Sequence, residues 1–408
     1  MTGLDPALAA LLERVDTVVL ADGADGADIV PGLLAAEGRL GGADTGVGGR
    51  RVVVGWLPGE RAWTASLDGA DALMGGYGIR AAIREGRATY RPVRLSAIPR
   101  LLASMPRPMA TVVRGRPAGP GEGDGFVFGA SVGWAPAAAV LADAVIVEID
   151  PDAAPVPAPA VPGNVVGTVE GTANRVAPAW GDPDEIDRAI AANVLRVLPP
   201  APVLQYGPGP LLDTVVRRVD RPVGIFSGLA TDAVAELARD GRLRAGAPVV
   251  AGYLWGSDAL VALAQAGTLR LAPLEETHDV ARLAAIPQLV ALNTALQVGL
   301  DGAVNVERLG AEVVGGVGGH PDFARGASAS PDGLSVVVCR SAHRGRSNLV
   351  PRPLVTTTAR TDVDVVVTEH GVADLRGRSD DERARLLVDI AHPDHRAALS
   401  RGDDPNDG

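Results

Sequence analysis

Two glycine-rich turns are the strongest candidates for chemistry in this sequence. The first, Gly207-Pro208-Gly209-Pro210, follows a predicted strand at 203–206 and opens a predicted helix at 211–219. Backbone N–H groups at such a turn, with the positive end of the helix, can bind an anion or a carbonyl oxygen. Strand-to-helix turns also need glycine for steric reasons, so a purely structural role stays open.

The second turn, at 315–319, has four glycines in five positions and precedes His320. Glycines let a ligand approach the backbone closely, and a histidine can donate a hydrogen bond or act as a base near neutral pH. A flexible hairpin with a surface histidine is the alternative. We therefore treat Gly318, Gly319 and His320 as candidate site residues.

Other polar residues are weaker candidates. Residues 129–133 read GASVG and match the GxSxG pattern of serine hydrolases, with Ser131 at its centre. Nothing in the sequence singles out the acid and the histidine that a triad needs, so a packing role for Ser131 is favoured. Near the C-terminus, charged neighbours favour structural pairs over catalysis for the residues Glu369, His370, His392 and His395.

Composition excludes several classes of chemistry. The chain of 408 residues has no lysine, so all 38 basic residues are arginine. A Schiff-base lysine and a Walker lysine are therefore absent. The single cysteine, Cys339, excludes an internal disulfide, and neither Cys nor His recurs at zinc-site spacing. We expect no metal cofactor.

The net charge of −11, without a long run of basic residues, argues against nucleic acid as a partner. No apolar stretch reaches the roughly 18 residues that span a bilayer. The N-terminus carries acidic residues where a signal peptide has positive charge. We therefore expect a cytoplasmic protein with no membrane partner, and a homodimer, because dimers are common among symmetric soluble enzymes.

The order of elements predicts an α/β protein. Short apolar, β-branched runs such as 18–20, 52–54 and 144–147 alternate with alanine-rich helical patterns, which favours parallel strands with helices on both faces. The Pro-rich segment 151–162 interrupts this rhythm. We predict two open-sheet domains, 1–180 and 181–408, with a cleft between them.

The segment 365–399, VVVTEHGVADLRGRSDDERARLLVDIAHPDHRAAL, resembles the C-terminal signature of the acetyl-CoA hydrolase and CoA-transferase family. Residues 315–326, GGVGGHPDFARG, are similar to the family's GVGGQxDFxRG, and residues 204–215, LQYGPGPLLDTV, are similar to its LQxGIGxIPDAV. Weaker similarity continues into the first half, so the resemblance covers about residues 50 to 400. Within the family, the chain resembles the 4-hydroxybutyrate and butyrate:acetate CoA-transferases.

The resemblance implies two related open-sheet domains with an acyl-CoA between them, and transfer of CoA between carboxylic acids. In the family, a glutamate attacks the thioester and then carries CoA as a glutamyl thioester, while glycine N–H groups stabilise the oxyanions. By the same resemblance, the residues that would contact CoA are Gly207, Pro208, Gly209, Pro210, Leu211, Leu296, Gly318, Gly319 and Arg344.

The chain departs from the family at the nucleophile. The family's GIHTEMFSDG corresponds to residues 224–233, GIFSGLATDA, and Gly228 occupies the place of the glutamate. Asp232 and Glu236 lie further along the chain, and His320 stands where the family has Gln. We therefore expect an acyl-CoA hydrolase or a CoA-transferase with an altered mechanism. The alternative is a non-catalytic CoA-binding homologue.

Overall fold

The computed structural model describes residues 5–36, 38, 40, 50–150, 154–171 and 178–406. Contacts along the chain divide it into two compact units. Unit 1 comprises residues 1–178, 251–276 and 313–316, and unit 2 comprises residues 179–250, 277–312 and 317–408. Residues 151–153 of the predicted Pro-rich break, and residues 172–177 just before the predicted boundary, lie outside the described residues.

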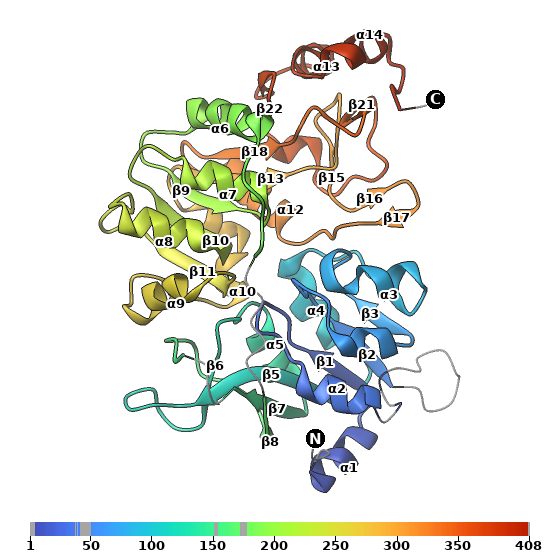
Figure 1. Cartoon of the computed structure of the whole chain (residues 1–408), viewed down its shortest axis with the longest axis vertical. Helices are drawn as coiled ribbons and strands as arrows, with labels where there is room; N and C mark the ends of the chain where they lie inside the picture. The colour runs from blue at the N-terminus through green and yellow to red at the C-terminus, as the bar shows by residue number, and fades with distance from the viewer. Residues whose placement is uncertain are drawn as a thin grey trace. The chain divides into compact units, whose positions relative to one another are not determined.

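The sheet of unit 1 has the strand order β4-β3-β2-β1-β5-β7-β8, with β6 paired to β5 (Figure 1). Its strands are β1 (Thr17–Leu20), β2 (Arg51–Val54), β3 (Ala70–Ala72), β4 (Ala88–Tyr90), β5 (Met109–Pro117), β6 (Phe126–Phe128), β7 (Ala144–Ile149) and β8 (Val165–Glu170). Pairing is parallel except between β5 and β6. Every residue of β1 is buried, as an apolar run covered on both faces requires. Along β8 the burial alternates.

The helices of unit 1 are short. They are α1 (Pro6–Glu13), α2 (Ile29–Ala36), α3 (Arg80–Arg84), α4 (Ile98–Ala103) and α5 (Ala135–Leu141), with α9 (Asp258–Gln265) and α10 (Leu274–Thr277) coming from later in the chain. Apolar residues of α1 to α5 and of α10 contribute to two clusters of buried side chains, one around Val18 and Val52 and the other around Val19 and Val53. Alternate residues of β1 and β2 thus bury their side chains in different clusters, as the period of a strand dictates.

The second sheet has the order β12-β11-β10-β9-β13-β18-β22-β23. Its strands are β9 (Val203–Tyr206), β10 (Gly224–Ala230), β11 (Val249–Leu254), β12 (Arg270–Leu271), β13 (Leu289–Thr294), β18 (Leu334–Val338), β22 (Val365–Thr368) and β23 (Gly371–Asp374). Pairing is parallel from β10 through β9, β13 and β18 to β22, and antiparallel between β22 and β23. Both sheets are open and mainly parallel, so the predicted α/β class is confirmed.

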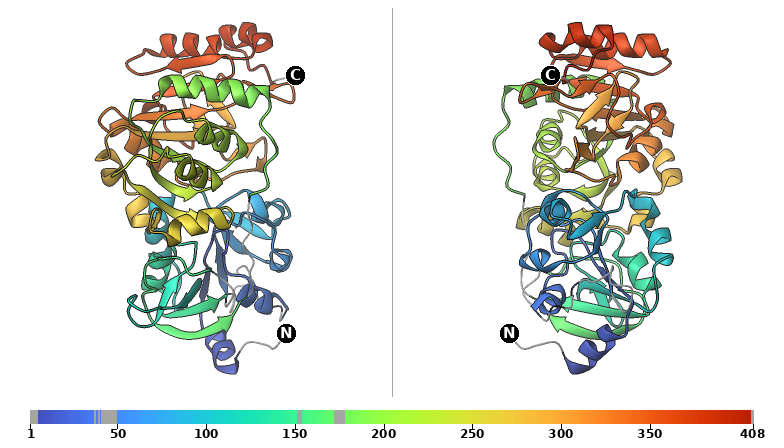
Figure 2. Two further views of the ribbon diagram at one scale, coloured as in Figure 1. Left: turned by 60° about the vertical axis from the view of Figure 1, so that its left-hand side comes forward. Right: turned by 90° about the vertical axis from the view of Figure 1, so that its right-hand side faces the viewer.

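Helices lie on both faces of the second sheet (Figures 1 and 2). The chain passes from β9 through α7 (Pro210–Arg217) to β10, but from β13 it reaches β18 on the other side through α12 (His320–Ala329). Right-handed crossovers in opposite directions place α7 and α12 on opposite faces. The other helices are α6 (Glu185–Val197), α8 (Asp232–Arg239), α11 (Val280–Ala284), α13 (Asp380–Asp389) and α14 (Pro393–Arg401).

Capping fixes the start of two of these helices. Asp184 and Asp187 form a capping box on α6, and Ser379 and Glu382 form one on α13. Each box satisfies backbone N–H groups that the first turn leaves unpaired. In the described part of the chain, no helix has the length and apolar character needed to cross a membrane.

Short strands beyond the second sheet complete the chain. β14 (Gln297–Gly299), β15 (Val304–Asn305) and β21 (Leu349–Val350) form a small sheet of their own. β16 (Arg308–Leu309) pairs with β17 (Glu312–Val313), and β19 (Ala342–His343) pairs with β20 (Arg346–Ser347) as a tight hairpin. The β19–β20 hairpin carries Arg344, one of the residues expected to contact CoA.

Candidate active site

The candidate site is built from strand ends and loops of unit 2. The order of the second sheet reverses between β9 and β13, because the chain continues from β9 to one side and from β13 to the other. Ligands of open α/β sheets bind outside the carboxyl ends of strands at such a switch point. Gly207 directly follows β9, and Leu296 lies between β13 and β14. The first glycine turn and Leu296 therefore follow two adjacent parallel strands.

The first turn has a conformation that glycine favours. Gly209 caps α7 with φ +141°, and Pro210 begins the helix. A β-carbon at position 209 would meet no atom within 4 Å, so the glycine is required by the backbone conformation and not by crowding. Gly207 donates its N–H to the carbonyl oxygen of Leu292 at 3.0 Å. The turn thus leaves open space beside the N-terminus of α7.

A buried amide pair lies under this turn. Gln205 on β9 and Asn293 on β13 exchange two hydrogen bonds, of 3.2 and 3.1 Å. Both side chains are buried, so each amide depends on the other for its partner. A β-carbon at Gly207 would lie 3.5 Å from Oδ1 of Asn293. The two amides therefore hold the start of the turn in place, and they do not fill the space beside Gly207.

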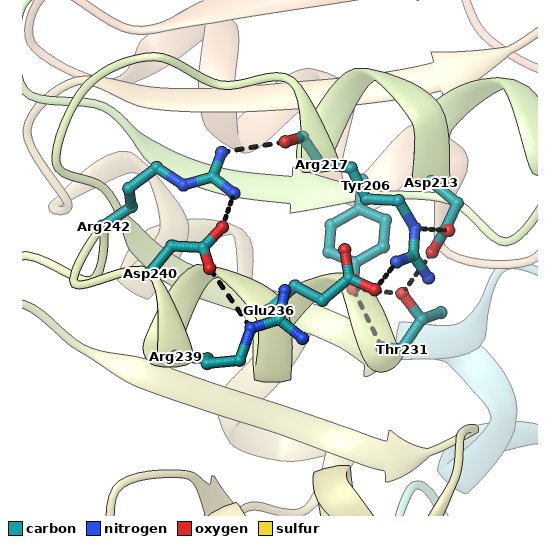
Figure 3. A network of polar contacts seen from close by, with 8 residues as sticks. All are labelled: Tyr206, Asp213, Arg217, Thr231, Glu236, Arg239, Asp240 and Arg242. Atoms are coloured by element: carbon teal, nitrogen blue, oxygen red, sulfur yellow. Dashed lines mark hydrogen bonds and ion pairs between the residues drawn. The ribbon is translucent and has the colours of Figure 1, made fainter.

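A polar network holds the end of β10 against α7 (Figure 3). Thr231 donates its backbone N–H to the Tyr206 hydroxyl at 2.9 Å and its own hydroxyl to Asp213 at 2.6 Å. All three side chains are buried, and burial raises the pKa of Tyr206 well above its usual value. These bonds fix the segment after Gly228 relative to α7, and the first glycine turn directly precedes this helix.

The same network engages Glu236, a possible substitute for the missing glutamate (Figure 3). Arg217 donates to Asp213 at 2.5 Å and also pairs with the carboxylate of Glu236. On the far side, Arg242 donates to the Arg217 carbonyl oxygen at 2.8 Å and to Asp240 at 2.6 Å. Glu236 thus ties α8 to α7, and its carboxylate is not free to attack a thioester.

The position of the missing glutamate lies beside a buried histidine. Gly228 is the one half-exposed residue of β10. A β-carbon there would lie 3.2 Å from Cε1 and 3.3 Å from Nε2 of His278, and 3.5 Å from the ring of Phe323. A β-carbon at Gly319 would lie only 2.6 Å from the same Nε2. The His278 ring therefore packs against two glycines from β10 and the start of α12.

His278 is held on its other sides. Its ring centroid lies 4.6 Å from that of Phe323, and its Nδ1 lies 2.8 Å from the Thr277 hydroxyl. The residue is 1% exposed, and burial lowers its pKa from 6.5 to about 3. The imidazole is therefore neutral at physiological pH. Sequence reasoning missed this residue, because nothing in the segment LEETHDVARL marks its histidine as functional.

His320 is also neutral at physiological pH, and its lowered pKa makes it a weaker base than an exposed histidine. It is the first residue of α12, it is 7% exposed, and its Nδ1 lies 2.7 Å from the Thr358 hydroxyl. Burial lowers its pKa from 6.5 to about 4. Its Nε2 is buried and has no hydrogen-bond partner among the described residues. The pKa of His320 thus lies below the value of about 6.5 that an unperturbed imidazole has, and its role as a base stays a prediction.

The second glycine cluster divides between the units. Gly315 and Gly316 belong to unit 1, where a β-carbon at Gly316 would lie 2.3 Å from the Met74 sulfur and a β-carbon at Gly75 would lie 2.1 Å from the Gly315 carbonyl oxygen. Close backbone packing explains these glycines. Gly318, with φ +59°, and Gly319 belong to unit 2 and lead into α12, so only this part of the cluster stays in the candidate site.

Arg344 lies at the exposed tip of the β19–β20 hairpin, with φ +49°. Its guanidinium makes no hydrogen bond or ion pair with the described residues. The hairpin follows β18, which is the parallel neighbour of β13. An uncommitted guanidinium on such a loop is suited to a phosphate group.

Ser131 has no triad within its own unit. Unit 1 contains no histidine, since all six belong to unit 2. Ser131 forms an isolated antiparallel bridge with Tyr253, and its hydroxyl is buried without a hydrogen-bond partner among the described residues. A β-carbon at Gly133 would lie 1.7 Å from the Tyr253 hydroxyl, which explains a glycine of the motif by packing.

The C-terminal candidates have structural contacts. Glu369 accepts hydrogen bonds from the backbone and hydroxyl of Ser341, at 2.9 and 2.6 Å. His392 caps α14 by accepting from the Asp394 N–H at 3.4 Å. The rings of His370 and His395 lie 5.7 and 5.6 Å from the ring of His392. These contacts fix the C-terminal segment around β22 and α14.

Comparison with known proteins identifies the family. Residues 256–402 match the model of the acetyl-CoA hydrolase/transferase C-terminal domain. The chain is 30% identical over 362 residues to a 4-hydroxybutyrate coenzyme A transferase of Clostridium kluyveri, covering 81% of this chain and 80% of that protein. The chain belongs to the acetyl-CoA hydrolase/transferase family.

One further relative and one solved structure match most of the chain. A butyryl-CoA:acetate CoA-transferase of Anaerostipes caccae is 28% identical over 356 residues, covering 80% of this chain and 78% of the relative. The crystal structure of RipA from Yersinia pestis has the same fold, with a TM-score of 0.81 at 23% identity over 95% of this chain and 93% of that chain. The predicted family is therefore confirmed over most of its expected extent.

Proposed function

We propose that this member of the acetyl-CoA hydrolase/transferase family acts on a small acyl-CoA thioester without a covalent glutamyl-CoA intermediate. The observation that carries the proposal is Gly228. It stands where the family motif has its glutamate, and it has no side chain to attack the thioester or to hold CoA between two half-reactions. Glu236, further along the chain, is engaged by Arg217.

The remaining parts of a thioester site support this proposal. The N-termini of α7 and α12 present backbone N–H groups beside Gly209 and Gly319, where negative charge on a ligand is stabilised. Such donors accelerate a reaction when they bind the developing oxyanion more strongly than the ground-state carbonyl. In this proposal Gly207–Leu211, Leu296, Gly318 and Gly319 contact CoA, and Arg344 binds one of its phosphates.

The nucleophile then comes from outside the protein. Water or a carboxylate attacks the thioester carbonyl carbon, and the carbonyl oxygen takes up the electron pair as an oxyanion. When the carbonyl forms again, the C–S bond breaks and CoA leaves as a thiolate that takes a proton from solvent. Attack by water gives a free acid and CoA, so hydrolysis needs neither a nucleophilic side chain nor a second bound substrate. Transfer without a covalent enzyme adduct requires both substrates to bind together.

A non-catalytic CoA-binding homologue is the second candidate, and the same glycine at position 228 favours it. Both candidates predict CoA binding, but only the first predicts release of CoA from acyl-CoA. The experiment is to incubate the protein with several short acyl-CoAs, with and without acetate, while free thiol and exchange of CoA are followed. Release of thiol above the uncatalysed rate supports the enzyme. Binding of acyl-CoA without release or exchange supports the non-catalytic homologue.

A further inference from the structure

The β19–β20 hairpin, which carries Arg344 at its tip, is too short to be stable by itself. Each of its strands has two residues, and only two pairs of residues align between them. Arg344 and Gly345 form the turn, and both have a positive φ, of +49° and +78°. Two such residues are typical of a type I′ turn. Because an isolated two-stranded hairpin is marginally stable in water, its position depends on contacts from outside.

A residue beyond α14 makes such a contact with the second strand. The side chain of Asn406 accepts a hydrogen bond from the Ser347 N–H at 2.9 Å and donates one to the Ser347 carbonyl oxygen at 3.0 Å. Across the hairpin, Asn348 donates its N–H to the Ser341 carbonyl oxygen at 3.0 Å. Since successive residues of a strand direct their polar groups to opposite sides, those of Ser347 point away from β19. Ser347 is buried, so its backbone groups need the partner that Asn406 provides.

Local turns place Asn406 beside the hairpin. Helix α14 ends at Gly402, whose φ of +79° turns the chain and whose N–H donates to the Leu399 carbonyl oxygen at 3.0 Å. Further along, the Asn406 N–H donates to the Asp404 carboxylate at 2.9 Å. Leu399 is buried in the same core cluster as Leu349, which follows the hairpin. The chain between α14 and Asn406 is therefore held at both of its ends.

Asn406 is the main outside contact of the end of the hairpin. Among the described residues, the hydrogen bonds between residues 342–347 and the chain outside 340–350 all involve Asn406. The third of them, donated by Arg346, is exposed and 3.5 Å long, so the two bonds of the amide carry the contact. The start of the hairpin is held separately by Glu369, which accepts two hydrogen bonds from the residue before β19.

We propose that Asn406 is a positioning residue for CoA binding, because it holds the β19–β20 hairpin so that the Arg344 guanidinium is presented to a CoA phosphate. This inference rests on the proposed function, in which Arg344 makes that contact. A guanidinium pairs with a phosphate through two parallel hydrogen bonds, and this geometry is lost when the backbone below it moves. Asn406 lies beyond residues 256–402, so the region that matches the family model does not include it.

The first test measures amide hydrogen exchange in the unmodified protein without CoA, by mass spectrometry with fragmentation that resolves single amides. We expect the Ser347 amide to be protected, because its N–H donates to Asn406 before any ligand binds. In Asn406→Ala this amide should exchange faster, whereas the amides of unit 1 should keep their wild-type rates. Free exchange at Ser347 in the unmodified protein, or equal protection in the variant, overturns the inference.

The second test measures the affinity for CoA by calorimetry. If loss of the amide leaves about a quarter of the molecules with the hairpin in its binding conformation, the apparent Kd rises about fourfold. We therefore expect Asn406→Ala to bind CoA about fourfold more weakly, a smaller loss than that of Arg344→Ala. Asn164→Ala in unit 1 is the matched control, with wild-type affinity expected, because its amide donates only to an exposed loop carbonyl oxygen. Unchanged affinity of Asn406→Ala contradicts the inference.

Two readouts separate positioning from a general loss of stability. In an Arg344→Ala background, Asn406→Ala should change the affinity for CoA by less than about twofold, because it acts through the guanidinium. With a short acyl-CoA, Asn406→Ala should raise KM and leave kcat unchanged, since a phosphate remote from the thioester is bound equally in the ground and transition states. An effect of Asn406→Ala on affinity that persists in full without the Arg344 side chain rejects the inference.

The outcomes separate the inference from the proposed function. If the wild-type protein does not bind CoA, the proposed function fails and the inference fails with it. If CoA binds and Arg344→Ala lowers the affinity while Asn406→Ala does not, only the inference fails. The exchange measurement on the unmodified protein needs no substitution, so loss of folding in a variant does not protect the inference.

Discussion

The packing of His278 against two glycines predicts an order of stability among simple variants. A β-carbon at Gly319 would lie 2.6 Å from Nε2 and 2.7 Å from Cδ2 of His278, and 3.1 Å from the Phe323 ring. At Gly228 the nearest His278 atoms lie at 3.2 and 3.3 Å. Contacts below 3.0 Å force the buried ring to move, whereas those at Gly228 require a shift of only a few tenths of an ångström.

We therefore expect Gly319→Ala to lower the free energy of unfolding by about 1–3 kcal/mol, the usual range for overpacking a core. Gly228→Ala should cost less than about 1 kcal/mol, because its milder crowding is partly offset by the lower entropy of the unfolded alanine chain. The backbone adds no strain at position 319, where φ is −90°. Gly181→Ala is the control, since a β-carbon there would meet no atom within 4 Å.

The assay is urea unfolding followed by circular dichroism, repeated in a His278→Ala background. With the ring removed, Gly319→Ala should lose most of its cost, which gives a coupling free energy of about 1 kcal/mol or more between positions 278 and 319. The reasoning is refuted if Gly319→Ala is no less stable than Gly228→Ala. Equal costs of Gly319→Ala with and without the imidazole would also refute it.

Three further predictions concern pH, Glu236 and Arg344. In the folded protein His278 and His320 have pKa values of about 3 and 4, below the value near 6.5 of the unfolded chain. The unfolded state therefore binds more protons, and the free energy of unfolding falls as the pH drops from about 6.5 toward 4. The decrease is up to about 1.4 kcal/mol per pH unit for each group. The slope of unfolding free energy against pH should be shallower in His320→Gln, and an unchanged slope contradicts the pKa. Glu236→Gln should leave the rate of CoA release unchanged, because its carboxylate pairs with an arginine; a loss of more than tenfold would assign it a role in the reaction. Arg344→Ala should weaken CoA binding about tenfold by calorimetry, while Arg346→Ala on the same hairpin should not, and equal affinities would reject a phosphate contact by Arg344.

Local sequence patterns predicted the elements better than their assembly. The strand at 203–206 and the turn after it were predictable, because a short apolar run, glycines and a helical period all act within a few residues. The helix starting at Asp380 was equally clear, since Ser379 and Glu382 form a capping box. These features depend on backbone geometry that neighbouring residues determine.

The composition of the site was not predictable in the same way. His278 is separated from Gly228 by 50 positions and from Gly319 by 41, and only the crossovers of the sheet bring them together. The burial that lowers the pKa of His320 likewise comes from its tertiary surroundings. The glycine cluster at 315–319 looks uniform in sequence, yet Gly316 packs tightly against Met74 while Gly318 precedes α12. Local sequence patterns do not indicate contacts between residues that are so far apart in the chain.

The absence of a glutamate at position 228 also predicts how a restored carboxylate would behave. Gly228→Glu would place the start of its side chain 3.2–3.5 Å from His278 and Phe323. This crowding is mild, so the new carboxylate should have room to extend into the half-exposed space beside β10. We expect the variant to gain CoA transfer between an acyl-CoA and acetate. Gly228→Gln is the matched control, because it has the same size without a nucleophilic carboxylate.

The most direct test of the central claim is intact-mass spectrometry of the unmodified protein during turnover of a short acyl-CoA, with free thiol measured in the same sample. The absence of a carboxylate at Gly228 predicts that thiol is released while the protein mass stays unchanged, and that borohydride does not inactivate the protein. A protein species heavier by the mass of CoA, or inactivation by borohydride only in the presence of acyl-CoA, would show a covalent enzyme–CoA thioester and contradict the account.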